Sequence, residues 1–229
     1  MTILGKDFQY FRSLLPYLQQ FSLPVFFPAL PPAGYIEERA RALSAFLDHL
    51  KAERIDLIAH SMGGLDCRYV IHHFNSQRRI RTLTTITTPH HGTPLAQWVI
   101  DGEVPFSACL RRLALPALYD LTPQSCKQFN AEIGDDPDVI YRSYAAMRPV
   151  GEMPLLFRPW TEALSASDGD NDSQVPVASA RWGEFKGILR ADHVELTGWN
   201  MGWRNKAQAR PFEHLRFYAS LVQELAASG

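Results

Sequence analysis

The sequence has few cysteines and no long hydrophobic run. Its three cysteines, Cys67, Cys109 and Cys126, are an odd number in a chain of 229 residues, which argues against a disulfide framework. We expect free thiols, with a Cys109–Cys126 bridge as the alternative. No apolar run reaches the roughly 18 residues that a membrane-spanning helix needs, and the first residues lack the successive regions of a signal peptide. The chain as written is therefore expected to be soluble and cytoplasmic, or secreted if a signal peptide precedes it.

An excess of charge of either sign is also lacking. The chain has 23 Lys and Arg residues against 24 Asp and Glu residues, a formal net charge of -1, and the basic residues form no stripe. Nucleic acid is therefore not an expected partner. The eight histidines show no zinc-ligand spacing such as H-E-x-x-H, which disfavours a zinc enzyme. With 46% hydrophobic residues, the chain is expected to form one domain over residues 1–229.

Short apolar or β-branched runs alternate with helical patterns along the chain. Runs of strand length occupy residues 23–27, 55–60, 82–87 and 139–145. Residues 34–53 repeat apolar side chains three and four positions apart, as an amphipathic helix does, and residues 63–74 are helical in pattern. A last helix is expected to begin at Pro211. This alternation predicts an α/β fold with a parallel sheet and helices on both faces.

Two proline-rich segments interrupt the alternation. Residues 89–125 open with "PHHGTP" and are apolar but contain further prolines. Short helices over a pocket are expected there, with a segment resembling a lid at about residues 95–125. Residues 148–160, "RPVGEMPLLFRPW", are expected to form an ordered loop against the body of the domain.

The stretch "AHSMGG" around Ser61 follows an apolar run of strand length and precedes a helical pattern. A nucleophilic serine needs this context, because a sharp turn between a strand and a helix exposes its hydroxyl group. Ala59 and Gly63 leave room for the turn, and Gly64 lets the helix pack closely. The backbone N–H of Met62 would then point at a forming oxyanion.

A serine nucleophile also needs a histidine base and a carboxylate that orients this histidine, in the chain order serine, acid, histidine. Asp172 is preferred as the acid over Asp168 and Asp170, because it precedes "SQVP", a turn into an apolar pair. His193 in "ADHVEL" is preferred as the base over His214, which falls within a helical pattern. His49, His72 and His73 fall within helical patterns and are interpreted as surface residues. His60, His90 and His91 are expected closer to the site, but without the spacing of metal ligands.

These motifs resemble the bacterial triacylglycerol lipases of the α/β-hydrolase superfamily, the true lipase group. The resemblance covers nearly the whole chain and rests on "AHSMGGLDCRYV", "LTTITTPHHGTPLA", "LTPQSCKQFN", "YRSYAA" and "NDSQVPVASARWG" followed by "DHVEL". The family's N-D-G-x-V segment, which carries the acid, is matched at Asp172, and its N-H-L-D segment at His193. The resemblance therefore implies an α/β-hydrolase fold with a small helical lid and the triad Ser61, Asp172 and His193.

The chain departs from the family pattern near the histidine and at its start. Many members hold a structural calcium ion beside the histidine. Here Glu195 keeps a carboxylate at the first ligand position but Trp199 occupies the second, so no cofactor is expected and Glu195 is a weak calcium candidate. Members also begin with a buried strand, and the residue after its His-Gly end donates the second oxyanion N–H. Here that strand is expected to be truncated, Ile3 falls on the donor position, and the neighbouring strand is expected to have an exposed edge.

The expected function is hydrolysis of hydrophobic carboxylic esters, such as acylglycerols, through an acyl-enzyme intermediate. Five apolar residues of the segment resembling a lid are expected to line or cover an acyl-chain groove, which favours contact with a lipid interface: Trp98, Phe106, Leu113, Leu115 and Leu118. Two alternatives stay open. The same triad serves thioesterases, acyltransferases and phospholipases, and a truncated chain is also compatible with a catalytically impaired scaffold.

Overall fold

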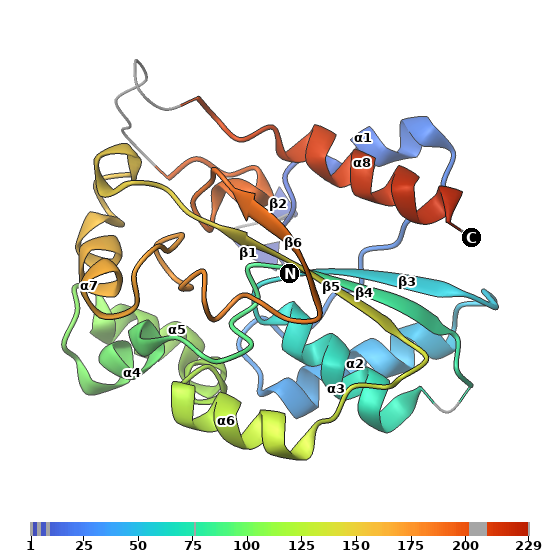
Figure 1. Cartoon of the computed structure of the whole chain (residues 1–229), viewed down its shortest axis with the longest axis horizontal. Coiled ribbons are helices and arrows are strands. Elements are labelled where there is room, and N and C mark those ends of the chain that lie inside the picture. Colours follow the sequence, from blue (N-terminus) through green and yellow to red (C-terminus); the bar gives the residue numbers. More distant parts are fainter. Residues whose placement is uncertain (1, 4–5, 8–9, 76, 202–209, 229) are drawn as a thin grey trace.

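Four parallel strands form the central sheet of the protein. The computed structural model describes residues 2–3, 6–7, 10–75, 77–201 and 210–228. The strands are β3 (Ile55–His60), β4 (Ile80–Ile86), β5 (Ile140–Ala146) and β6 (Glu184–Leu189), hydrogen-bonded in the order β3-β4-β5-β6. Because consecutive strands are neighbours and run in the same direction, each connection crosses over the sheet through helices (Figure 1). The prediction of an α/β fold with a parallel sheet is confirmed.

The predicted strands agree with the structure at three positions and fail at one. Residues 55–60 form β3 as predicted, and the runs at 82–87 and 139–145 largely coincide with β4 and β5. Residues 23–27 form no strand; Pro24 and Pro28 bracket the apolar residues, and proline cannot donate a hydrogen bond to a neighbouring strand. The apolar character of the segment serves packing instead, since Val25 lies against the core beside α8.

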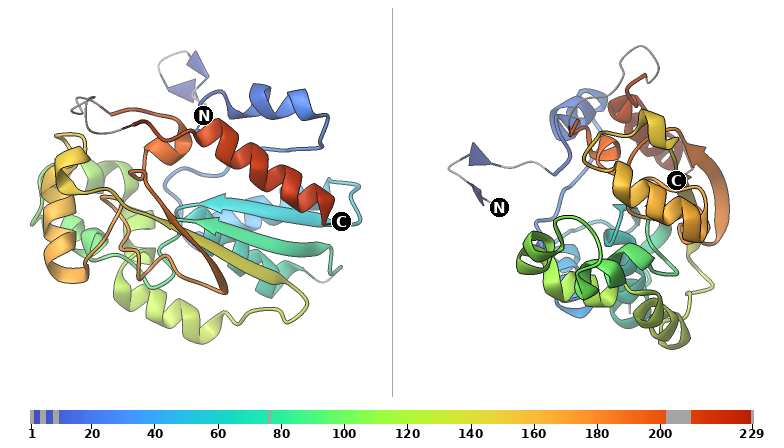
Figure 2. Two further views of the ribbon diagram at one scale, coloured as in Figure 1. Left: turned by 45° about the horizontal axis from the view of Figure 1, so that its top comes forward. Right: turned by 90° about the vertical axis from the view of Figure 1, so that its left-hand side faces the viewer.

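Helices cover both faces of the sheet. On one face lie α2 (Ile36–Asp48) and α3 (Gly63–Phe74), whose apolar sides pack against β3 and β4. On the other face lie α1 (Leu14–Leu18) and α8 (His214–Ala227), which share a core with the ends of the strands (Figures 1 and 2). The predicted last helix is present, but it begins at His214 rather than at Pro211.

A group of short helices lies beyond the carboxyl ends of the strands (Figure 1). It comprises α4 (Pro94–Asp101), α5 (Ser107–Asp120), α6 (Pro123–Glu132) and α7 (Arg158–Asp168). Thr93 and Thr122 cap α4 and α6 through their hydroxyl oxygens, and each of these helices has proline at its start, where the missing N–H costs nothing. The loop predicted for residues 148–160 extends only as far as Phe157, because α7 begins at Arg158.

Helix α5 is bent in its middle. Ala114 has the non-helical angles φ -140° and ψ 19°, two residues before Pro116, and a proline disfavours helical geometry in the residues just before it. The second half of α5 packs through Ala117 against Met62 and Leu65. The first half exposes Leu113, whose side chain is 67% exposed. The two halves of this helix therefore lie in different environments.

The first residues form a hairpin outside the main sheet. Strands β1 (Thr2–Ile3) and β2 (Lys6–Asp7) pair antiparallel with each other, and in the right-hand view of Figure 2 the hairpin projects from the body of the protein. Within the described strands, β3 consequently has a neighbour on one side only. Strand β3 is thus an edge strand among the described strands, although its residues are all buried or half-buried.

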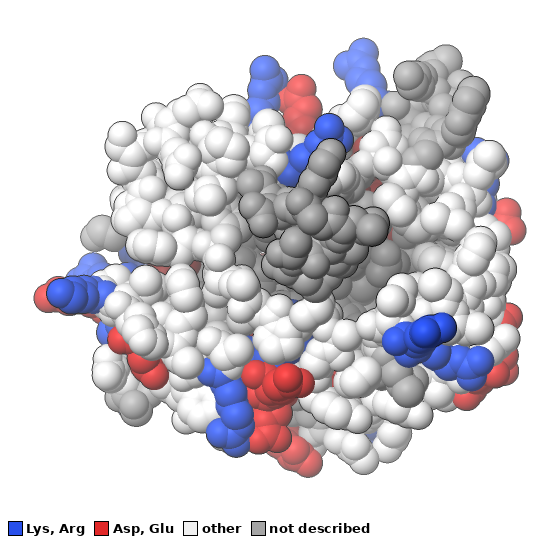
Figure 3. Space-filling view, turned by 180° about the vertical axis from the view of Figure 1, so that it is seen from behind, with Lys and Arg blue, Asp and Glu red and all other residues white. Residues whose placement is uncertain are grey.

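The face seen from behind is poor in charge over α1 and the chain that follows it (Figure 3). No charged residue occurs between Arg12 and Glu37, and Phe26 is 56% exposed there. The three cysteines are free thiols, as expected, and Cys109 lies at the surface. Over the described part of the chain, no helix combines the length and the apolar character needed to cross a membrane.

Candidate active site

Ser61 lies on a sharp turn between β3 and α3. Its φ angle is 56°, in the left-handed region that a residue other than glycine adopts only where its surroundings enforce it. The Ser61 N–H donates to the carbonyl oxygen of Ile86 over 3.0 Å, and the Thr88 hydroxyl donates to the Ser61 carbonyl oxygen over 2.7 Å. A Cβ atom added to Gly64 would overlap the Thr88 side chain. The turn is therefore held by the neighbouring strand and by close packing at Gly64.

Met62 follows the turn as the residue that caps α3 at its N-terminus. The first N–H groups of a helix have no partner within the helix and lie at the positive end of its dipole. The Met62 side chain is buried, 7% exposed, in a cluster with Leu65 and Ala117, which fixes the backbone beside Ser61. The site predicted for an oxyanion at Met62 therefore has the polarity that it needs.

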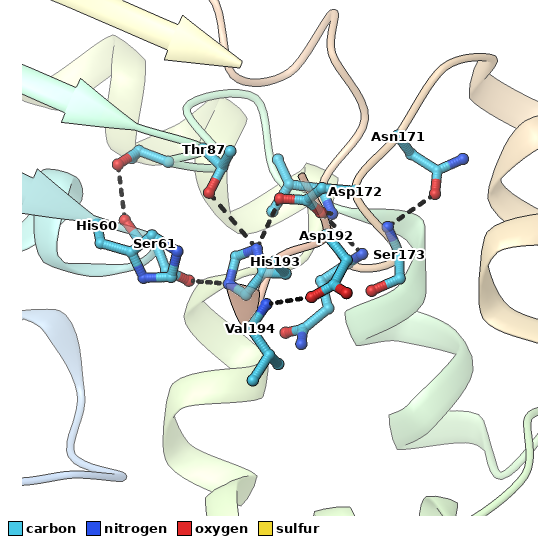
Figure 4. A network of polar contacts seen from close by, with 12 residues as sticks. His60, Ser61, Thr87, Asn171, Asp172, Ser173, Asp192, His193 and Val194 are labelled. Atoms are coloured by element: carbon cyan, nitrogen blue, oxygen red, sulfur yellow. Dashed lines mark hydrogen bonds and ion pairs between the residues drawn. The ribbon is translucent and has the colours of Figure 1, made fainter. Parts of the chain in front are cut away.

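His193 lies in the loop after β6 and faces Ser61 (Figure 4). Its Nε2 is 2.9 Å from the Ser61 hydroxyl oxygen, and its Nδ1 is 2.7 Å from Asp172 Oδ2. With the proton on Nδ1, His193 donates to Asp172 and accepts from Ser61, which is the tautomer that a general base requires. The side chain is almost wholly buried, 5% exposed, so its orientation is fixed.

Asp172 is fully buried in the loop after α7. Its Oδ1 accepts hydrogen bonds from the backbone N–H groups of Gln174, over 3.0 Å, and Val175, over 2.8 Å. Its carbonyl oxygen accepts from the His193 N–H over 2.9 Å. Asp168 and Asp170, the alternatives that the sequence offered, are exposed. The structure thus brings Ser61, His193 and Asp172 into one hydrogen-bonded chain.

His60 lies close to the site, as expected. Its ring centroid is 4.6 Å from that of His193, and its Nδ1 is 2.8 Å from the Tyr10 hydroxyl. Burial, and then the charge that His193 can carry, hold the pKa of His60 well below its ordinary value. His60 is therefore a neutral imidazole that lies against His193. Its position next to Ser61 in the sequence was the available signal.

Glu195 is paired with an arginine that sequence reasoning missed. Arg148 Nε lies 2.7 Å from Glu195 Oε2 and Arg148 Nη2 lies 3.1 Å from Glu195 Oε1, with both side chains buried. A guanidinium ion therefore faces the carboxylate that was the weak candidate for calcium, and calcium requires several oxygen ligands around an open cavity. Within the described ranges, no group of three or more His, Cys, Asp or Glu side chains could hold a metal ion. The residues around Glu195 do not fit a calcium ion.

The remaining predicted residues lie outside the hydrogen-bonded chain. Strand β1, which contains Ile3, pairs with β2, and the role of Ile3 as an oxyanion donor stays a prediction. His214 bonds the Arg12 carbonyl oxygen over 2.9 Å. His90 stacks on Trp182 with ring centroids 5.2 Å apart.

Comparison with known proteins identifies the class to which this fold and site belong. Residues 33–101 match the family described as PGAP1-like alpha/beta domain. A metagenomic carboxyl esterase superimposes with a TM-score of 0.80 over 96% of this chain and 70% of its own, at 19% identity. The lipase of Staphylococcus hyicus does so with a TM-score of 0.69 over 96% of this chain and 90% of its own, at 16% identity. The fold is thus that of the α/β-hydrolase lipases and esterases.

The sequence relationship is more specific. The chain is 33% identical over 248 aligned residues to triacylglycerol lipase 2 of Saccharomyces cerevisiae, covering 97% of this chain and 75% of the yeast protein. The chain belongs to the lipase-like α/β-hydrolase family of this yeast protein, and it is an ester hydrolase. The resemblance to lipases is confirmed at this level, although the relative with this coverage is a yeast protein rather than a bacterial one.

Proposed function

We propose that the protein hydrolyses hydrophobic carboxylic esters, including acylglycerols, with Ser61, His193 and Asp172 as its catalytic triad. The observation that carries the proposal is the hydrogen-bonded chain from the Ser61 hydroxyl through both nitrogens of His193 to buried Asp172. The yeast relative is named a triacylglycerol lipase, which supports an acylglycerol as the substrate class.

The geometry supports a two-step reaction. Ser61 Oγ attacks the ester carbonyl carbon while His193 Nε2 takes its proton, and Asp172 stabilises the resulting imidazolium ion. The oxyanion of the tetrahedral intermediate accepts a hydrogen bond from the Met62 N–H, with Ile3 as the proposed second donor. His193 then gives its proton to the leaving alcohol. In the second step His193 takes a proton from water, which attacks the acyl-enzyme and releases the carboxylic acid.

An apolar cluster beside His193 supports a hydrophobic acyl group. Residues of α4 and α7 form its buried part, and Trp98, Leu118 and Val194, the neighbour of His193, pack against it. On the adjoining surface, Phe106 is 58% exposed and Leu113 is 67% exposed. Exposed apolar side chains of this kind favour contact with lipid. Within the single proposed domain of residues 1–229, we assign the first half of α5 the role of a lid.

The bend at Ala114 gives this lid a defined boundary. The half of α5 after the bend is fixed against Met62 through Ala117, whereas Phe106 and Leu113 before the bend are exposed. Leu113→Ser should therefore lower hydrolysis of long-chain esters more than hydrolysis of short-chain esters. An equal effect on both would argue against the lid.

The test of the proposed function is hydrolysis of p-nitrophenyl esters from acetate to palmitate by the wild type and by Ser61→Ala. We expect turnover that requires Ser61 and that extends to long chains. Labelling of Ser61 by a fluorophosphonate, which needs an activated serine, provides a second readout. A folded wild type that neither cleaves an ester nor reacts with the probe would contradict the proposal and favour a catalytically impaired scaffold. Turnover of thioesters alone would indicate a thioesterase.

A further inference from the structure

The turn that carries His193 is closed by its own side chains. Asp192 Oδ1 accepts hydrogen bonds from the N–H groups of Val194, over 2.9 Å, and Glu195, over 2.8 Å. Glu195 Oε2 in return accepts from the Asp192 N–H over 3.0 Å. These bonds fix the shape of the turn at residues 192–195. They do not fix where this turn, which follows β6, sits relative to Ser61, which follows β3.

Arg148 joins this turn to two other segments of the chain. It lies two residues after the end of β5, and its guanidinium binds both oxygens of Glu195. Its Nη2 also donates to the Arg210 carbonyl oxygen over 2.7 Å, and its Nη1 to Glu152 Oε2 over 3.0 Å. Glu195 Oε1 further accepts from the N–H of Phe212, just before α8, over 3.1 Å. One buried cation therefore links the end of β5, the turn with His193 and the entry to α8.

The chemistry of this contact is specific to a guanidinium. The Arg148 side chain is fully buried and that of Glu195 is 6% exposed, so either charge alone would be costly in this environment. Burial lowers the pKa of Arg148, but the hydrogen bonds and charges of Glu195 and Glu152 outweigh it and the net pKa is raised. Arg148 stays charged. A planar guanidinium bound to both carboxylate oxygens also fixes the orientation of the Glu195 carboxylate, which a point charge does not.

We infer that Arg148 is a positioning residue for His193, acting through Glu195 as a cation built into the fold. The inference rests on the proposed function, because it assigns to Arg148 the placement of the proposed base against Ser61. The buried Glu195 carboxylate needs a nearby positive charge, and Arg148 supplies it. Hydrolysis is consequently independent of added metal ions.

The experiment compares kcat and KM of the wild type with those of three variants. Arg148→Met combined with Glu195→Gln removes both charges and leaves no unpaired ion, and Arg148→Lys keeps the charge without the planar guanidinium. The control is Arg81→Met with Asp56→Asn, which removes another bidentate pair, with distances of 3.0 and 2.7 Å. That pair lies at the opposite ends of β3 and β4 from Ser61. Thermal melts and circular dichroism verify that each variant is folded at the assay temperature.

We expect kcat of the neutral double variant to fall by about 10- to 100-fold, the size of effect known for groups that orient metal-binding side chains, with KM nearly unchanged. Arg148→Lys should recover part of this loss, and the control pair should lose thermal stability but keep its kcat. Excess EDTA should leave the wild-type activity unchanged.

Three results would overturn the inference while the proposed function stands. They are full kcat in the folded neutral double variant, an equal loss of kcat in the control pair, and loss of wild-type activity in EDTA that CaCl2 restores. A wild type without ester turnover, or a Ser61→Ala variant that retains it, would instead refute the proposed function, and the role of Arg148 would fall with it.

Discussion

Replacing Asp172 with asparagine tests the proposed triad with the smallest change in shape. In the wild type, one carboxylate oxygen accepts from the N–H groups of Gln174 and Val175, and the other lies 2.7 Å from His193 Nδ1. Asparagine has one oxygen, which the two N–H groups of the loop will take. Its NH2 group then faces Nδ1, and His193 must carry its proton on Nε2. That nitrogen can no longer accept the proton of Ser61.

The magnitude follows from this wrong tautomer. The corresponding substitution in serine hydrolases lowers kcat by about 10⁴-fold, which corresponds to a barrier raised by roughly 5 kcal/mol. The assay is steady-state hydrolysis of p-nitrophenyl butyrate, with a thermal melt to verify folding. Asp170→Asn is the matched control, because Asp170 is exposed in the same loop, and it should keep wild-type kcat. If Asp172→Asn kept more than a tenth of the activity, or if both variants lost it equally, the assignment of Asp172 would be wrong.

Three further predictions concern the packing and titration around the site. Gly64→Ala should lower both activity and thermal stability because its Cβ would displace Thr88, whereas Gly63→Ala should be tolerated because its Cβ would meet Ala59 at 3.8 Å; equal effects would contradict this. Ser173 has φ 85° and its buried hydroxyl has no partner among the described residues, so Ser173→Gly should raise the free energy of unfolding by about 1 kcal/mol in urea titrations. The pKa of buried His60 is held well below 6.5, so the unfolded chain binds a proton there that the folded chain does not. The stability that is present above about pH 6.5 should therefore be lost as the pH falls, by up to about 1.4 kcal/mol per pH unit, and His60→Asn should reduce this slope between about pH 7 and pH 5.

The residues of the candidate site could be chosen from the sequence because each follows either a local sequence pattern or a fixed order along the chain. The turn at Ser61 requires small neighbours between a strand and a helix, a pattern that a short stretch of consecutive residues can display. The acid and the base follow in a fixed chain order, and few candidates remain after Ser61. Whether the exposed or the buried aspartate of one loop serves as the acid depends on burial, and there the choice of Asp172 rested on the turn that follows it.

Arg148 could not be predicted, because its role depends on a partner 47 residues away. An arginine after a strand carries no local signal of burial, and the expectation for a charged residue is the surface. Two errors in the predicted strands have a similar origin: β6 was not predicted, and residues 23–27 were predicted as a strand. Strand β6 alternates exposed and half-buried residues at the edge of the sheet, so it lacks an apolar run. Residues 23–27 have such a run, but their apolar side chains pack against the core and the segment pairs with none of the described strands.

On the proposed mechanism, the reactivity of Ser61 depends on the completion of folding. Its bond to His193 joins residues 132 positions apart, and in a parallel sheet the two ends meet only after every intervening crossover has formed. Contacts between distant residues of a chain are among the slowest to form, because the entropy of closing the loop is lost before they are made. The rate at which Ser61 becomes reactive during refolding therefore measures the last step of assembly, and intermediates with helices and a partial sheet will be silent in that assay.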